Sequence, residues 1–262
     1  MTKKIDIATV VGYIGAFASI VIALLTFEGG KEYYTIFFEI PAFMVAFVGS
    51  FFAVIAQFSL EEIKRIPKIL INGFVQNVYD APTIIREIVK NAEIARKEGI
   101  LALEKVLEQT KDPFMRKGIQ LAIDGTPPDT LEKLLTLELE NEQARHETGY
   151  RLFEQCATLA PAFGMMGTII GLGLALIQMK EPEKVGPAIA ASLLSTLYGV
   201  FACYAIYTPI AKKLEKRSEI ESFAKHLIIR GIVSIQSGDN PRIIEEKLKA
   251  FLATKERNFS VK

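Results

Sequence analysis

Two threonines within long uncharged apolar runs have the side chains best suited to contact an ion. Thr168 and Thr196 each lie near the middle of such a run, so two antiparallel helices would place their hydroxyls at similar depth. Hydroxyl and carbonyl oxygens are ligands for a hard cation that sheds part of its water, and the pair therefore predicts a polar lining for an ion path. The alternative is that each hydroxyl bonds the backbone carbonyl four residues earlier in its own helix.

Ionisable residues are absent from both of these runs, which cover residues 156–179 and 185–211. A proton or ion relay normally needs an ionisable group at membrane depth. Among the apolar runs of the chain the one candidate is Glu39, which is closely followed by Pro41. It lies in the run 34–58, near the end that we expect to face outside. It could receive ions from outside or simply be a hydrated carboxylate at the interface. If the protein moves ions, we expect a partner helix to bring the carboxylate.

Small residues recur at helical spacing in the same two runs. Such spacing lets helix backbones approach closely in lipid, and it predicts either ordinary packing within the chain or a tightly packed wall around another helix. On the earlier run the residues are Gly164, Gly167 and Gly171, and on the later run they are Ala188, Ser195, Gly199 and Ala202.

Two prolines flank this glycine-rich region. Pro161 and Pro209 each remove a backbone hydrogen-bond donor from a predicted helix. The carbonyl that loses its partner can make the position a kink or a hinge.

Four apolar runs are long enough to cross a membrane, which takes about 20 residues in a helix. They cover residues 7–27, 34–58, 156–179 and 185–211. The first is too long for the core of a signal peptide, so we interpret it as a retained helix. Of the 31 Lys and Arg residues, only Lys31, Lys180 and Lys184 lie between spans one and two or between spans three and four. Because basic residues concentrate on the inner side, the sequence predicts that both termini and the insert between the second and third spans are cytoplasmic.

The insert and the tail both have helical patterns. Residues 83–110 form an amphipathic run, Asp112 and Pro113 are typical of an N-cap and first helical position, and residues 126–129 form a turn. The chain then continues without a breaker into the third span. We therefore predict an all-α integral membrane protein with two outer spans (1–58), a helical cytoplasmic domain (59–152), two further spans that wall an ion path (153–211) and a helical cytoplasmic tail (212–262).

Composition excludes several other classes. The chain has 31 basic and 30 acidic side chains, a balance that argues against a nucleic-acid binder. Cys156 and Cys203 lie in apolar runs and are typical of small buried side chains. There is no phosphate-binding glycine loop, nucleophile elbow or metal-ligand cluster in the sequence, so we expect no enzyme activity, no cofactor and no metal site.

Four motifs together resemble the MotA/PomA family, the A subunits of the bacterial flagellar stator. They are EIPAF at 39–43, ARKEGILALEKV at 95–106, LAPAFGMMGTIIGL at 159–172 and STLYGVFACYAIYTPIA at 195–211. The resemblance implies an inner-membrane protein of motility and chemotaxis that forms a pentamer around a dimer of a single-span MotB/PomB-type subunit. In the family an aspartate of that subunit carries the ion, and the cytoplasmic domain of the A subunit pushes the rotor protein FliG.

The resemblance also assigns roles to particular residues. It implies rotor contact for Arg96 and Glu104, which would share a face of a continuous helix, whereas composition alone would make this a solvated surface. The neighbouring rotor candidates are Lys97, Glu98, Lys105 and Glu108. Pro161 and Pro209 match the mechanistic prolines of the family. Thr168 and Thr196 match threonines of sodium-driven members, so we expect sodium as the coupling ion, with the proton as the alternative.

Two other functions compete with this reading. The related ExbB/TolQ class shares the glycine-rich helices and energises outer-membrane processes, but its members have three spans and this chain is predicted to have four. A passive membrane scaffold is the second alternative, and ion flux with a B-type partner would separate it from a motor.

Overall fold

The computed structural model describes residues 3–5, 7–26, 39–77 and 79–254 of the chain. These are helical apart from short connections and two paired three-residue strands, β1 (Lys3–Ile5) and β2 (Val75–Asn77). The chain divides into two compact units. The apolar unit comprises Ile5–Gln76 and Glu147–Glu215, and the polar unit is built mainly from Asn77–His146 and the chain from Lys216 onward.

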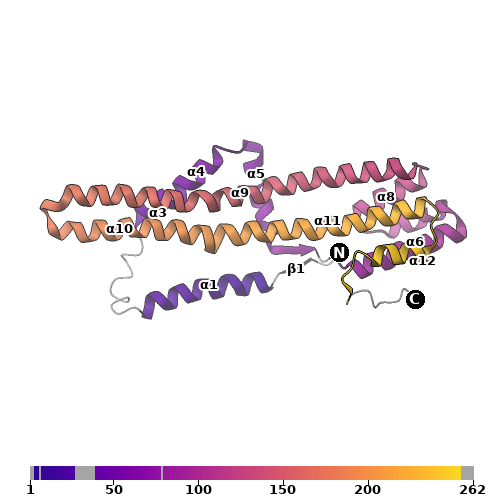
Figure 1. The fold of residues 1–262 in the computed structure, drawn as a ribbon, viewed down its shortest axis with the longest axis horizontal. Helices are drawn as coiled ribbons and strands as arrows, with labels where there is room; N and C mark the ends of the chain where they lie inside the picture. The colour runs from indigo at the N-terminus through magenta and orange to yellow at the C-terminus, as the bar shows by residue number, and fades with distance from the viewer. Residues whose placement is uncertain (1–2, 6, 27–38, 78, 255–262) are drawn as a thin grey trace. The chain divides into compact units, whose positions relative to one another are not determined.

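The apolar unit holds the helices that correspond to the predicted spans. They are α1 (Ile7–Thr26), α3 (Ile40–Phe43), the π-helical turn η2 (Met44–Gly49), α4 (Ser50–Ile55), the second half of α9 (Pro128–Ile177), the 3₁₀ turn η4 (Gln178–Lys180), α10 (Pro182–Phe201), the π-helical turn η5 (Ala202–Tyr207) and the start of α11 (Thr208–Gln236). Within this unit α9 and α10 lie side by side (Figure 1).

Two helical stretches are long and apolar enough to cross a membrane, Pro128–Lys180 and Pro182–Gln236. Two apolar helices that are shorter than these stretches, Val11–Ala23 and Ile40–Ile55, lie within the first two predicted spans, 7–27 and 34–58. In the first long stretch only 17% of the 18-residue apolar segment is buried, and in the second the buried share is 33%. A core helix of a water-soluble protein would bury its apolar face, so this exposed surface needs lipid or other subunits against it.

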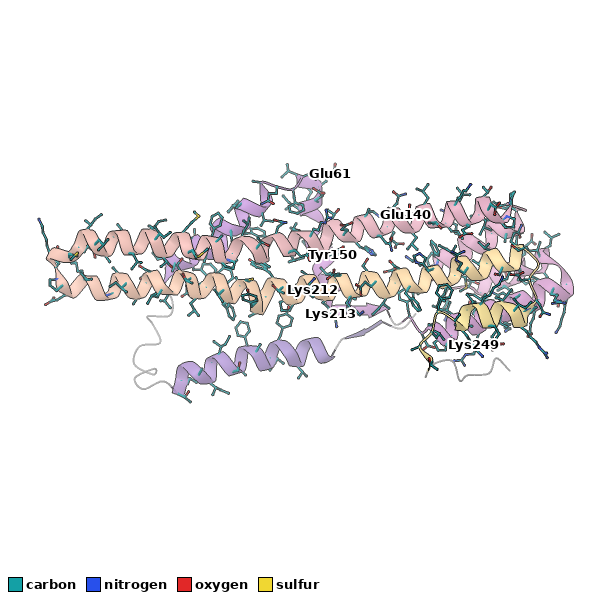
Figure 2. The ribbon with its side chains drawn as sticks, viewed as in Figure 1. Glu61, Glu140, Tyr150, Lys212, Lys213 and Lys249 are labelled. Carbon is teal, nitrogen blue, oxygen red and sulfur yellow. The ribbon has the colours of Figure 1, made fainter. Side chains whose placement is uncertain are left out.

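The apolar unit has a smaller core of its own, against which its amphipathic helix α5 (Leu60–Phe74) packs. Leu152, Phe153 and Cys156 of α9 are buried there, and Ile66 and Ile69 of α5 pack against them. Ser59, directly before α5, forms a capping box with Glu62: the backbone N–H of Ser59 donates to Glu62 Oε2 at 2.7 Å, and the N–H of Glu62 donates to Ser59 Oγ at 3.4 Å. Figure 2 shows the side chain of Glu61, in the same first turn, on the outside.

The polar unit surrounds an aliphatic core. Its helices are α6 (Ala81–Glu98), the 3₁₀ turn η3 (Ile100–Leu103), α7 (Glu104–Gln109), α8 (Pro113–Ile123), the first part of α9, the end of α11 and α12 (Pro241–Lys249). Leu135 and Leu139 of α9 meet Leu227 and Ile232 of α11 in one buried cluster, which also includes Ile85 of α6. These side chains recur at three- and four-residue spacing, and this is why helices form with one face buried.

The helix starts of the polar unit follow local rules. Asp112 is an N-cap whose carboxylate accepts a hydrogen bond from Met115 N at 2.9 Å, and Pro113 occupies the first turn, as predicted. Asp80 caps α6 in the same way, accepting from Thr83 N at 3.0 Å. The predicted turn after Gly125 is also confirmed, and a second turn lies at Gly238, since both glycines have positive φ angles that end helices.

The amphipathic run 83–110 departs from the expectation of one continuous helix. Gly99 has a φ of +87°, which an α-helix cannot contain, and it ends α6. The chain then makes the turn η3 before α7 begins at Glu104. The idea that Arg96 and Glu104 share a face of an unbroken helix is therefore wrong, because a helix break lies between them.

Prolines within helices have different effects along the chain. Helix α5 continues through Pro67, and α9 continues through Pro161, so neither helix is broken at its proline. Pro209 lies in the first turn of α11, directly after the π-helical turn η5. A π turn has the wider i→i+5 bonding, and such turns are common where a helix must accommodate an irregularity. The expected continuous helix from the turn at 126–129 into the third span is confirmed by α9.

Candidate functional site

Helices α9 and α10 pack backbone to backbone through the predicted glycines. A Cβ atom added to Gly164 would lie 2.8 Å from the carbonyl oxygen of Ser195 and 3.3 Å from the Cα of Gly199. A Cβ on Gly199 would collide with the carbonyl oxygen of Ala160. Both neighbours are backbone atoms that cannot rotate away. These two positions therefore require glycine for the helices to approach this closely.

Further along the pair, two serines of α10 face the other glycines of α9. A Cβ on Gly167 would collide with the side chain of Ser195, and one on Gly171 with the side chain of Ser192. Ser192 Oγ donates to Ala188 O at 2.6 Å. Ser195 is 1% exposed, and its Oγ has no hydrogen-bond partner within the described part of the chain. The sequence marked Ser195 only as a small residue and did not single out Ser192, although the three-residue spacing of the two serines places them on one face.

The two threonines meet across this interface. Thr168 Oγ1 and Thr196 Oγ1 are 2.5 Å apart. Thr168 Oγ1 is also 3.1 Å from Gly164 O, four residues earlier, and 2.9 Å from Ser192 O on α10. The hydroxyl of Thr168 thus bonds its own helix, as the alternative reading expects, and it also lies in a cluster of oxygens from two helices. The side chains are partly exposed rather than buried.

Glu39 lies at the start of a helix and not within one. Its φ of −88° and ψ of 106° are extended, and α3 begins at the next residue with Pro41 in its first turn. The Glu39 carboxylate makes no capping bond, while its backbone N–H donates to the hydroxyl of Tyr198 on α10 at 3.2 Å. Tyr198 also meets the ring of Phe43 with centroids 6.4 Å apart. Sequence reasoning missed Tyr198, whose position two residues after Thr196 offered the only hint.

The two candidate hinges have different surroundings. Pro161 follows Ala160, whose carbonyl lies against Gly199 of α10, so Pro161 is next to the close helix contact. Pro209 follows η5, and there the hydroxyl of Tyr13 donates to Ile206 O at 3.4 Å. Phe17, one turn further along α1, packs edge-on against Phe201 at 5.4 Å. Helix α1 thus contacts the segment in front of Pro209 by one polar and one aromatic contact.

The charged residues proposed for rotor contact lie on the polar unit, on either side of Gly99. All six side chains are exposed, and within the described part of the chain none of them forms an ion pair. Three of them, Arg96, Lys97 and Glu98, are the last residues of α6. The other three, Glu104, Lys105 and Glu108, lie in α7. Exposed charges without an intramolecular partner are free to meet charges on another protein.

Comparisons with known proteins show the family to which this chain belongs. Residues 106–226 match the model of the MotA/TolQ/ExbB proton channel family. The chain is 40% identical to motility protein A of Borreliella burgdorferi over 253 residues, covering 97% of this chain and 96% of that one. It is 36% identical to the chemotaxis protein PomA of Vibrio alginolyticus, with 94% and 95% covered.

Among solved structures, the flagellar MotAB stator complex from Bacillus subtilis is similar, with a TM-score of 0.88, 31% identity and coverage of 96% of this chain and 98% of that chain. These matches are to a proton channel family, to a motility protein and to a flagellar stator complex. The chain therefore belongs to the motility protein A family of flagellar stator subunits.

Proposed function

We propose that this chain forms an ion channel with a single-span B subunit and couples sodium influx to torque on the flagellar rotor. The observation that carries the proposal is the α9–α10 pair, where two threonine hydroxyls meet in a glycine-packed contact. No carboxylate lies in the third or the fourth predicted span, residues 156–179 and 185–211. The carboxylate that carries the ion therefore has to come from another helix. The similar structure from Bacillus subtilis is a complex of MotA with MotB.

The proposed topology has four spans, with both termini in the cytoplasm. Of the 31 basic residues, 28 lie at the N-terminus, in the insert or in the tail, and basic segments stay on the inner side. We assign residues 1–58 and 153–211 to paired spans, and 59–152 and 212–262 to the cytoplasmic domain and tail. The exposed apolar surface of the spans fits lipid and neighbouring copies, for which we propose a pentamer.

We assign the rotor contact to the charged residues around Gly99. The helix break presents two short charged segments instead of one flat face. Electrostatic contacts of this kind favour rapid and repeated association over tight binding, which suits a stator that acts on a moving rotor. FliG is the proposed partner.

Sodium is the proposed coupling ion because of the oxygens around Thr168. The Thr168 hydroxyl lies within hydrogen-bond distance of both the Thr196 hydroxyl and the Ser192 carbonyl. A sodium ion that sheds water needs such oxygens, whereas a proton bound to a carboxylate does not. Glu39 is proposed as an outer residue that meets the ion first. Pro161 and Pro209 are proposed as hinges of the moving helices.

The test is swimming of a stator-deletion strain that expresses this chain with the B subunit from its own genome. Thr168→Ala and Thr196→Ala should each reduce swimming most at low sodium. Thr158→Ala is the matched control, because Thr158 is an exposed threonine of α9 that bonds only its own helix, at Glu154 O. If wild-type swimming is independent of sodium, the sodium proposal is wrong. If the wild-type pair conducts no ions at all, the chain is a scaffold.

A further inference from the structure

Among the described residues of the polar unit, one lysine is buried, close to the aliphatic core. Lys225, on α11, is 5% exposed, whereas lysines of folded proteins are almost never this buried unless they are paired. Its position follows Ala224 and precedes Leu227 and Ile228, all of them buried. Nothing in the sequence distinguishes it from the other basic residues of the tail.

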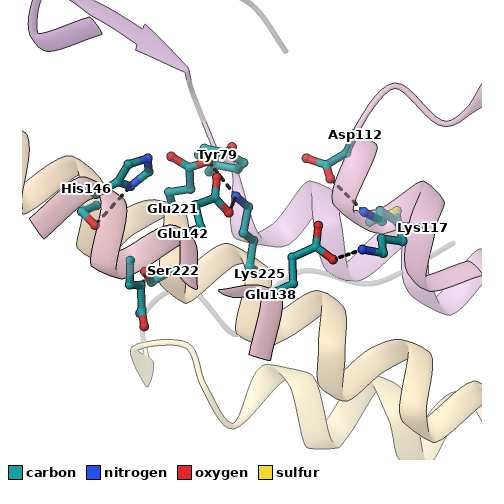
Figure 3. Close-up of polar contacts among 12 residues, drawn as sticks. Tyr79, Asp112, Lys117, Glu138, Glu142, His146, Glu221, Ser222 and Lys225 are labelled. Carbon is teal, nitrogen blue, oxygen red and sulfur yellow. Dashed lines mark hydrogen bonds and ion pairs between the residues drawn. The ribbon is translucent and has the colours of Figure 1, made fainter. Parts of the chain in front are cut away.

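Lys225 joins several separate segments of the polar unit (Figure 3). Its ammonium group forms ion pairs with Glu142 of α9 and, at 2.9 Å, with Glu221 one turn earlier on α11. The hydroxyl of Tyr79 donates to the same oxygen of Glu221 at 3.0 Å. Tyr79 stands directly before Asp80, the N-cap of α6. The Lys225 network, defined as Lys225, Glu142, Glu221 and Tyr79, thus links α9, α11 and the start of α6.

The ring of Phe114 adds a fourth segment. Lys225 Nζ lies 5.5 Å from its centroid, within the range of a cation–π contact. Phe114 is the second residue of α8 and is itself buried in the aliphatic core. Lys225 itself therefore contacts side chains of α8, α9 and α11, and it reaches the start of α6 through Glu221, which accepts from Tyr79.

The contacts within the network keep Lys225 and Glu221 ionised despite their burial. Burial alone would favour the neutral amine, but the hydrogen bonds to Glu142 and Glu221 outweigh it and raise the pKa of Lys225. Burial would likewise raise the pKa of Glu221, but the bond and charge of Lys225 outweigh it and the pKa is lowered. Burial and the adjacent Glu221 charge raise the pKa of Tyr79, so its hydroxyl stays a donor. At neutral pH all three groups keep the form that their hydrogen bonds require.

Such a network contributes positioning more than stability. Desolvation of buried charges offsets much of their attraction, and well-packed apolar replacements are often just as stable. The aliphatic side chains around it are non-directional, so they tolerate small shifts of one helix along another. Hydrogen-bonded charges do not, because a shift would leave a buried charge without its partner.

We propose that Lys225 is a positioning residue for torque transfer, which holds α6 in register against α9 and α11 and so fixes the charged surface at the end of α6. This inference rests on the proposed rotor contact of Arg96, Lys97 and Glu98. Force on that surface passes into α6, and the network fixes α6 at its other end, at Tyr79, to the two long helices. An apolar core without the network would let part of that force move α6 instead.

The test neutralises the whole network at nearly constant volume, with Lys225→Met, Glu142→Gln and Glu221→Gln combined. This avoids the unpaired buried charge that would unfold a single variant. The matched control is Lys117→Met with Glu138→Gln, which removes an ion pair at 2.5 Å between α8 and α9 whose lysine is 55% exposed. Both are expressed with the B subunit in the stator-deletion strain, and torque is followed with a bead on the flagellum as single stator units join.

The proposal predicts that the neutral triple variant lowers the torque of each unit by about twofold or more, while the control variant keeps wild-type torque. A purely structural role would lower the number of units but leave the torque of each unit unchanged, and that result would overturn the proposal. Unchanged torque and unit number would overturn it as well.

A second measurement does not depend on the rotor. In the purified complex with the B subunit, hydrogen exchange of the α6 amides should be faster in the neutral triple variant, while exchange around Leu227 should not change. Equal exchange in α6 would contradict the register role. If wild-type protein drives no rotation but α6 exchange behaves as stated, the proposed function fails while the network still holds α6 in place.

Discussion

The two units of this chain use opposite solutions to the same problem of packing α-helices. In the apolar unit, α9 and α10 touch through glycines, and backbone atoms of one helix lie against those of the other. In the polar unit, α9 and α11 are separated by large aliphatic side chains such as Leu139 and Ile232. The difference follows from the solvent. In water, burying large apolar side chains drives association, whereas in lipid such side chains gain little from leaving the surroundings, and close backbone contact is what remains.

Large-to-small substitution should therefore have its greatest effect in the polar unit. Leu139→Ala removes a side chain that is 2% exposed in the aliphatic core, and such a change costs about 2–5 kcal/mol. We expect a clear loss of stability in thermal unfolding of the purified complex with the B subunit. Leu137→Ala, on the same helix but 56% exposed, should have almost no effect. Equal losses for the two variants would mean that Leu139 is not part of a packed core.

Small-to-large substitution should show the reverse preference. Gly199→Ala places a methyl group against the Ala160 carbonyl, and overpacking of this kind costs about 1–3 kcal/mol. Because the α9–α10 contact holds the threonine pair, we also expect a large loss of swimming. Gly173→Ala is the control, since apart from the neighbouring backbone of its own helix no heavy atom of the described residues lies within 4 Å of the added Cβ, and alanine favours the helix. Wild-type swimming of Gly199→Ala would show that the backbone contact is not needed for function.

The smallest expected effect is a pH dependence that belongs to the Lys225 network. The pKa of Glu221 is lowered from its ordinary value of 4.5, so its added stability is complete above that pH and is lost as the pH falls through the lower, folded-state pKa. The pKa of Lys225 is raised from 10.5, so its contribution is complete below that pH and is lost only at still higher pH. Melting temperature should thus fall less between pH 7 and pH 3.5 in the neutral triple variant than in wild type. A parallel fall in both proteins would show that other carboxylates dominate acid unfolding.

Much of the fold and part of the candidate site were predictable, because local chemistry determines them. The cap at Asp112, the turns at Gly125 and Gly238 and the unbroken α9 follow from neighbouring residues alone. The approach of Thr168 to Thr196 also followed, since two antiparallel apolar helices have few ways to pair. The prediction failed at Gly99, where hydrophobic periodicity continued across a residue whose φ is positive. A periodic pattern reports which face is buried and not whether the helix is continuous.

The sequence by itself determined the apolar character of the chain, its helical class and the glycines of the α9–α10 contact. Each of these depends on residue type and on spacing within one segment. Tertiary structure alone decided which polar groups would meet across segments: Tyr198 with the backbone of Glu39, Tyr13 with Ile206, and Lys225 with Glu142. The physical reason is that a lysine on a charged helix is indistinguishable in sequence from its exposed neighbours. Only the fold removes it from water and makes its partners obligatory.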